Sequence, residues 1–192
     1  LNFKIELTPS QIEGPCPGIV ANGYHILTKP LRLDQFSVSE NANFALECWY
    51  KNSANWRNKK GWLLVKNSAK GHYGFFLNQG KMQAQLSVAG KSYDLNMKLK
   101  NAQLNDDKWH HLVLNCENDK ISFYIDGKLQ NSLKSSVPRQ ALRVPLLVGG
   151  FANGSLSQSY LDQIRLWKRS LSVSEISELH QNPQKQIPAH DL

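Results

Sequence analysis

Residues 109–128, with the sequence WHHLVLNCENDKISFYIDGK, decide the fold. Two apolar, strand-like runs, 109–116 and 121–125, are separated by a polar cluster of Glu, Asn, Asp and Lys. Directly after the second run, Asp126-Gly127 fits a two-residue hairpin turn, because this pair tolerates the two positive φ angles that such a turn needs. We therefore predict antiparallel strands joined by tight turns.

Similar short runs continue along the chain, at residues 3–7, 44–50, 62–66, 73–78, 81–88, 146–148 and 160–167. Asn78-Gln79-Gly80 predicts a second hairpin between two of them. Short strands with frequent turn signals are typical of a β-sandwich. One helix is predicted near the C-terminus, where Ser172 and Glu175 have capping-box spacing and Val173, Ile176 and Leu179 recur on one face.

The length of 192 residues fits a single domain. Pro and Gly are concentrated in residues 9–23, so we predict a lead-in strand and linker at 1–23, the domain at 24–182 and an exit linker at 183–192. No apolar run is long enough to span a membrane, so we expect no membrane insertion. Because the sequence opens on Leu1, we expect it to be a segment of a longer protein.

The net charge of +8 comes from one stretch of the chain. No acidic residue lies between Glu47 and Asp94, whereas eight basic residues do: Lys51, Arg57, Lys59, Lys60, Lys66, Lys70, Lys81 and Lys91. A surface of one sign attracts anions from a distance. The alternative is a solvated basic surface that keeps the protein soluble.

The cysteines do not form a disulfide framework. Cys48 and Cys116 lie inside apolar runs, while Cys16 lies in a Pro-Cys-Pro-Gly turn. Their separations fit no zinc-ligand spacing. We predict two buried thiols in strands, at Cys48 and Cys116, and one exposed or interdomain thiol at Cys16, with a disulfide bridge as the open alternative.

Several segments, in order, resemble the laminin G-like, concanavalin A-like jelly-roll modules. Residues 44–50 (FALECWY) resemble that family's F-x-hydrophobic-x-x-W-hydrophobic strand, 109–113 (WHHLV) its W-H-H strand, and 124–128 (YIDGK) its D-G-K hairpin. Residues 147–150 (LVGG) and 161–167 (LDQIRLW), the latter followed by Leu171-Ser172 and Glu175-Ile176, are similar to its last strands and helix. The resemblance implies an all-β, antiparallel two-sheet sandwich of jelly-roll topology with one short C-terminal helix.

Pentraxins are a related branch of this family, and the chain departs from their pattern. The positions of the pentraxin disulfide hold Glu47 and Val113, and residues 149–160 offer no acidic side chain for a pentraxin-like calcium cluster. Asp162 could ligate calcium as in some modules of the family, the alternative being a turn-facing or salt-bridged carboxylate. We expect no cofactor, with calcium at Asp162 as the one option.

Catalysis is the least favoured class of function. No predicted strand displays the carboxylate pair that a glycoside hydrolase requires, and no nucleophile elbow or phosphate loop is present. The paired His110 and His111 point to opposite faces of a strand, so they predict packing of a core Trp109 with hydrogen-bonded histidines and not a metal site.

Binding is favoured instead, with the polar segment 52–61 as the first candidate site. Trp56 offers a flat face for a sugar ring, Arg57 can hold a carboxylate or sulfate, and Lys59 and Lys60 add positive charge. This set suits an acidic polysaccharide. The alternative is that Trp56 folds back to cap the core.

A second candidate surface comprises His72, Tyr73 and Asn153, with Phe151 beside Asn153. The alternative places Tyr73 and Phe151 at the ends of the core and leaves His72 solvated. Trp49, Trp62 and Trp167 lie inside strands and are predicted to be packing residues.

Taken together, the sequence predicts a non-catalytic carbohydrate-binding module, not an enzyme, in a larger secreted or surface protein. The resemblance implies an extracellular, cell-surface or periplasmic location, with a glycan and other domains of the same chain as partners. A protein-binding adhesion or spacer module is the alternative, and a glycoside hydrolase-like enzyme is less favoured. No motif for nucleic-acid recognition accompanies the basic stretch.

Overall fold

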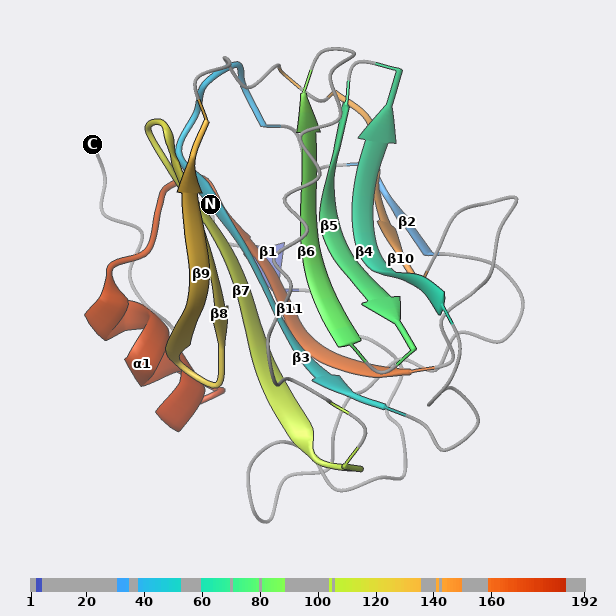
Figure 1. Cartoon of the computed structure of the whole chain (residues 1–192), viewed down its shortest axis with the longest axis vertical. Helices are drawn as coiled ribbons and strands as arrows, with labels where there is room; N and C mark the ends of the chain where they lie inside the picture. Colours follow the sequence, from blue (N-terminus) through green and yellow to red (C-terminus); the bar gives the residue numbers. More distant parts are fainter. Residues whose placement is uncertain are drawn as a thin grey trace.

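The computed structural model describes residues 3–4, 31–34, 38–52, 60–69, 71–79, 81–88, 104, 106–135, 141, 143–149 and 159–185. Two antiparallel sheets lie face to face (Figure 1). The six-stranded sheet has the order β1 (Phe3–Lys4), β11 (Tyr160–Trp167), β3 (Phe44–Lys51), β7 (Trp109–Glu117), β8 (Lys120–Ile125) and β9 (Lys128–Lys134). The five-stranded sheet has the order β2 (Leu31–Leu33), β10 (Leu146–Val148), β4 (Lys60–Ser68), β5 (Gly71–Asn78) and β6 (Lys81–Val88). The predicted two-sheet sandwich is confirmed.

The core lies between the sheets because alternate side chains of each strand point inward. The Phe75 ring of β5 meets the Phe123 ring of β8 with centroids 5.8 Å apart, which joins the two layers. Cys48 and Cys116 are both buried, as predicted. Burial raises the pKa of the Cys48 thiol well above its ordinary value, so it stays protonated.

Both predicted hairpins are confirmed. Asp126 and Gly127 have φ angles of 51° and 72° between β8 and β9, as a two-residue hairpin turn requires. Between β5 and β6, Gln79 takes a φ of 53°.

Helix α1 (Val173–Gln181) covers the side of the six-stranded sheet that is turned away from the core between the sheets (Figure 1). The predicted capping box is present: the Ser172 hydroxyl accepts from the Glu175 N–H, and the Glu175 carboxylate accepts from the Ser172 N–H. A second, smaller apolar cluster seals the helix against the sheet, formed by Ala45, Val113, Tyr124, Trp167, Leu171, Ile176 and Leu179.

Some elements differ from the prediction. Val173 is 64% exposed, so it does not share the buried face of Ile176 and Leu179. Strand β2 was not predicted. The hairpin at Asp126-Gly127 implied a strand after it, but the range of β9 was not predicted, because nearly every side chain of β9 is exposed and it carries no apolar alternation. Trp109 is half-buried at the start of β7, not in the core.

The ends of the described chain contact the sandwich. Phe3 and Lys4 pair with Leu166 and Arg165, so the predicted lead-in strand adds an edge strand to the larger sheet. Near the other end, the buried Pro183 gives its carbonyl to Arg165 Nη2 at 2.5 Å. Residues 5–7 of the predicted first strand lie outside the described residues. Within the described ranges, no helix is long and apolar enough to cross a membrane.

Candidate functional site

The outward side of β4, β5 and β6 brings aromatic, amide and basic side chains together. Tyr73, Phe75 and Leu77 of β5 belong to the core, so the side chains between them face outward. We call the resulting surface the outer face; it comprises Lys60, Trp62, His72, Phe76, Asn78, Lys81, Gln83 and Gln85.

A β-bulge in β4 sets the direction of Trp62. Trp62 lies opposite Phe76 and Leu64 lies opposite Phe75, so Leu63 is an extra residue on β4. Leu63 and Leu64 both enter the core, while Trp62 turns outward and is half-buried. The bulge thus presents an indole on a sheet face.

Ring contacts hold the Trp62 indole in place. It meets the edge of Phe76 with centroids 5.1 Å apart and that of His72 with centroids 5.4 Å apart. Gly74 lies between these two residues on β5, and a Cβ there would stand 2.0 Å from the Leu64 carbonyl oxygen. Glycine therefore permits the close approach of β4 to β5 that brings the three rings together.

Amides flank the aromatic row. Gln83 of β6 lies opposite Phe76, and Gln85 lies opposite Gly74. Gln85 Nε2 donates to Gln83 Oε1 at 3.2 Å, which orients both side chains. Such amides supply both donors and acceptors for hydroxyl groups.

Two lysines border the same face. Lys60, Asn78 and Lys81 form one cross-strand row next to the row of Trp62, Phe76 and Gln83. Both lysines are exposed, and two strand spacings set their Cα atoms about 10 Å apart. Because β4, β5 and β6 contain no Asp or Glu, the charged groups of their outer face are all positive.

The basic stretch predicted from the sequence is only partly a surface. Lys66 is fully buried, opposite Tyr73, and its ammonium donates to the Val144 carbonyl at 2.5 Å. Burial lowers the pKa of Lys66 to about 8. Its inclusion among surface cations was wrong, since the strand register turns it inward.

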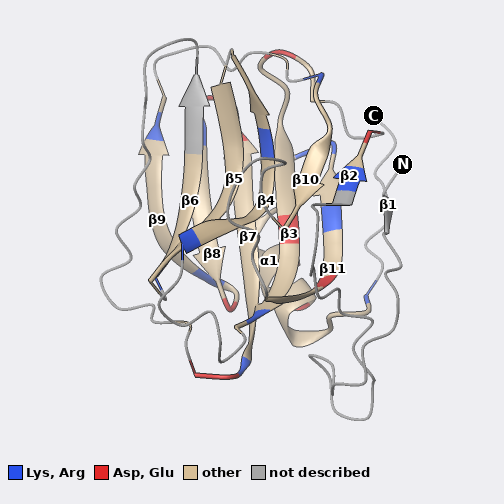
Figure 2. Cartoon of the chain, turned by 90° about the vertical axis from the view of Figure 1, so that its right-hand side faces the viewer, with Lys and Arg blue, Asp and Glu red and all other residues tan. Residues whose placement is uncertain are grey.

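The remaining cations of the stretch are not gathered on one sheet. Lys51 lies on β3 of the other sheet, and Figure 2 shows Lys and Arg on strands of both sheets. Arg57, Lys59, Lys70 and Lys91 lie outside the described residues.

The predicted site residues divide into three groups. Lys60 and His72 lie on the outer face. Tyr73 is 3% exposed and its ring packs against Phe44, so its prediction as a ligand contact is corrected to the alternative, a core residue. The predictions for Trp56, Arg57, Lys59, Asn153 and Phe151 fall outside the described residues.

Trp49 and Trp167 are buried packing residues, as predicted, but Trp62 is not. Phe76, Gln83 and Gln85 were missed altogether. The signal was available in β5, where Tyr73, Phe75 and Leu77 alternate and leave Phe76 as an aromatic residue on the opposite side.

A buried polar network lies on the other sheet, beneath α1. Glu47 Oε1 accepts from Arg165 Nη1 at 2.7 Å and bonds His111 Nε2 at 3.1 Å, and Oε2 accepts from Trp167 Nε1 at 2.8 Å. Glu47 lies directly opposite Val113, which agrees with their assignment to the bridged positions of pentraxins. Fully buried, Glu47 has a structural role and cannot reach a substrate.

His110 joins two carboxylates at the end of β7. Its Nδ1 bonds Asp126 Oδ2 and its Nε2 bonds Asp106 Oδ1, both at 2.9 Å. Although burial opposes the charged ring, these carboxylates raise the pKa of His110, and His110 in turn lowers the pKa of each despite their own burial. Asp126 Oδ1 also accepts the His111 N–H, so the group fixes the Asp126-Gly127 hairpin. The two histidines are hydrogen-bonded to different partners, as predicted.

The calcium prediction rests on Asp162, which is 6% exposed and accepts the Gln163 N–H at 2.7 Å. Calcium takes about six to eight oxygen ligands. Among the residues that the structure describes, no group of three or more His, Cys, Asp or Glu could hold a metal ion. Calcium at Asp162 stays a prediction.

Comparison with known proteins decides the family. A laminin G model, described as the concanavalin A-like lectin/glucanases superfamily, matches residues 28–177. The chain belongs to the concanavalin A-like lectin/glucanase superfamily. This concanavalin A-like chain is 26% identical over 154 residues to the adhesion G-protein coupled receptor V1 of Danio rerio, covering 75% of the chain and 2% of the receptor.

Solved structures share the concanavalin A-like architecture at low identity. Domain 4 of AbnA, an extracellular GH43 arabinanase from Geobacillus stearothermophilus in complex with arabinotriose, is similar with a TM-score of 0.66 and 16% identity, covering 79% of this chain and 72% of that one. The CBM40 of the Ruminococcus gnavus IT-sialidase, bound to α2,3 sialyllactose, has a TM-score of 0.58 and 12% identity, covering 82% of this chain and 96% of that one. These likenesses show the jelly-roll fold.

Proposed function

We propose that this concanavalin A-like domain is a non-catalytic carbohydrate-binding module and that its ligand is an acidic polysaccharide, bound on the outer face. One observation carries the proposal: the Trp62 and Phe76 row lies beside the Lys60 and Lys81 row on three strands without an acidic residue. Aromatic rings provide a stacking surface for sugars, and ammonium groups attract carboxylates and sulfates.

Each part of the outer face has a chemical role in this proposal. Trp62, fixed by Phe76 and His72, takes the apolar side of a sugar ring. Gln83 and Gln85 bond its hydroxyl groups, and Lys60 and Lys81 bind its anionic substituents. Trp56, Arg57 and Lys59 precede Lys60 in the sequence and stay predicted contributors to the same ligand.

Two relatives of similar fold support binding of a glycan, since domain 4 of AbnA holds arabinotriose and the CBM40 holds α2,3 sialyllactose. The engagement of three described carboxylates supports a non-catalytic role. Glu47 is sealed in its network, and Asp106 and Asp126 both bond His110. A retaining glycoside hydrolase needs two free carboxyl groups about 5 Å apart.

We further propose an extracellular or surface location within a larger protein. The receptor relative is an adhesion receptor, of which the matched region is only 2%. The same relative favours the second candidate function, a protein-binding adhesion or spacer module.

The test is affinity electrophoresis or calorimetry with polyuronates and sulfated polysaccharides, each matched to a neutral polymer. We expect Trp62→Ala to weaken binding about tenfold or more, as loss of an anchoring aromatic does. Trp62→Phe should retain part of the affinity. Lys60→Gln and Lys81→Gln should weaken binding to the acidic polymers and flatten its salt dependence, whereas Lys134→Gln on β9 is the matched control.

Equal affinities of Trp62→Ala and the unmodified chain would reject the outer face as the site. Binding to neutral polymers alone would reject the acidic ligand. Capture of a protein partner that survives enzymatic glycan removal, with no glycan bound, would decide for the adhesion module.

A further inference from the structure

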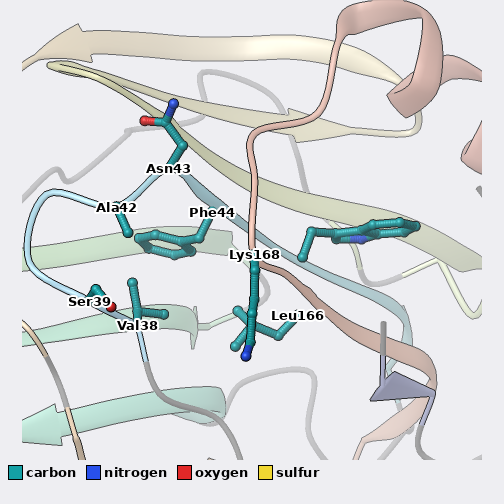
Figure 3. A pocket seen from close by; sticks show the side chains of 8 residues that line it. Val38, Ser39, Ala42, Asn43, Phe44, Leu166 and Lys168 are labelled. Carbon is teal, nitrogen blue, oxygen red and sulfur yellow. The ribbon is translucent and has the colours of Figure 1, made fainter. Parts of the chain in front are cut away.

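A separate pocket lies where the turn before β3 meets the end of β11 (Figure 3). Its volume is about 260 Å³. In Figure 3, Val38, Ser39 and Phe44 lie across a hollow from Leu166 and Lys168. The residues that line it are Val38, Ser39, Ala42, Asn43, Phe44, Leu166, Trp167 and Lys168, none of which belongs to the outer face.

The walls of this pocket are held by contacts that need no ligand. The Phe44 ring packs against Tyr73 with centroids 4.7 Å apart. The Trp167 indole N–H is fixed by Glu47 at 2.8 Å, and the turn closes with the Ala42 N–H donating to the Ser39 carbonyl at 3.3 Å. The pocket is thus formed in advance, which limits the entropy cost of binding.

The pocket is lined by apolar residues and by polar residues, of which one is charged. Val38, Phe44 and Leu166 are buried apolar residues, while Ser39 and Lys168 are exposed at the rim. No lining residue is acidic. The pocket therefore combines apolar walls with the polar side chains of Ser39 and Asn43 and with one positive charge, that of Lys168.

Lys168 is available for a ligand. It makes no ion pair within the part of the chain that the structure describes. Its neighbour Arg169 is engaged, because it bonds the Glu175 carboxylate at 2.6 and 3.0 Å and lies 5.6 Å from the Trp167 ring centroid. An ammonium beside an apolar wall favours a carboxylate whose other end is apolar.

We infer that this pocket binds a small organic acid. A short alkyl or aromatic group occupies the space between Phe44, Val38 and Leu166, and the carboxylate meets the Lys168 ammonium. The volume equals that of about nine liquid waters, which fits one such molecule and not an extended sugar chain. The site is independent of the proposed glycan function.

The experiment is a ¹H–¹⁵N NMR titration of the whole chain with three probes. Phenylacetate carries both features of the ligand, 2-phenylethanol lacks the charge, and acetate lacks the ring. We expect phenylacetate to shift amides of residues 38–44 and 166–168 and to bind more tightly than either other probe. Lys168→Gln should lower phenylacetate affinity about fivefold to tenfold without changing that of 2-phenylethanol, while Lys134→Gln changes neither.

A second variant, Ala42→Leu, fills the pocket and should abolish binding of both aromatic probes. If that variant fails to fold, the comparison of Lys168→Gln with Lys134→Gln decides alone. No shift at residues 38–44 and 166–168, or equal phenylacetate affinity with and without Lys168, would overturn the inference. Trp62→Ala should leave phenylacetate binding unchanged, so failure of the glycan proposal stays distinguishable.

Discussion

Glu47 shows how a single residue ties distant parts of the chain together. Its carboxylate bonds His111 on β7 and both Arg165 and Trp167 on β11. These partners lie 64 to 120 residues away in the sequence. Sequence spacing therefore could not reveal the network, although the resemblance to pentraxins had already singled out the position.

We predict that Glu47→Ala lowers the free energy of unfolding by about 3–5 kcal/mol, because the Arg165 guanidinium would stay buried without its carboxylate. Urea unfolding followed by tryptophan fluorescence measures the change. The exposed Glu40, in the turn before β3, gives a matched control that should cost little. A loss below about 1 kcal/mol for Glu47→Ala would contradict a stabilising role for the network.

Lys66 gives a prediction with a defined pH dependence. Its pKa falls from 10.5 to about 8 on folding, so between these values the unfolded chain binds more protons. The contribution of Lys66 to the free energy of unfolding therefore rises as the pH increases from about 8 to 10.5. At pH 7 we expect the free energy of unfolding of Lys66→Met to equal that of the unmodified chain or to exceed it by up to about 3 kcal/mol. By about pH 10 the variant should have become less stable relative to the unmodified chain.

Urea unfolding of both proteins at the two pH values tests this expectation. The control is Lys60→Met at an exposed lysine, whose effect on the free energy of unfolding should be the same at both pH values. A difference between Lys66→Met and the unmodified chain that is the same at both pH values would contradict it.

At the scale of elements, one bulge decides which way Trp62 and Lys66 face, and residue type alone had placed both on the wrong side. Strict alternation along residues 62–66 places Trp62 and Lys66 on the same side of β4. Leu63, the extra residue, reverses the alternation, so Trp62 faces outward and Lys66 enters the core. A bulge depends on the partner strand, here on Gly74 of β5, so the pattern of residues 62–66 alone does not predict it.

The start of helix α1, in contrast, was predicted correctly from its own residues, because a capping box is a local feature. We predict that Ser172→Ala lowers the free energy of unfolding by about 1 kcal/mol, the cost of losing an N-cap. Ser177→Ala within the helix is the matched control and should be neutral. Urea unfolding measures both; equal effects of the two substitutions would contradict the cap's contribution.

At the scale of the whole molecule, the sandwich was predictable and the site only in part. Turn signals and apolar runs are local, and the ordered motifs identified the architecture. The position of charged side chains on the surface does not follow from local sequence, because it depends on which strands pair and on which side of the sheet each residue lies. Of the described cations in the basic stretch, Lys60 and Lys81 lie in one cross-strand row, Lys51 lies on the other sheet and Lys66 is buried.

The most direct measurement is an NMR map of the amides that shift on titration with a uronic-acid hexasaccharide, with a neutral hexasaccharide as control. The account predicts shifts concentrated on β4, β5 and β6, strongest around Trp62, Phe76 and Gln83, and weaker or absent shifts with the neutral sugar. Shifts confined to the six-stranded sheet and α1, or the same shifts with both sugars, would contradict it.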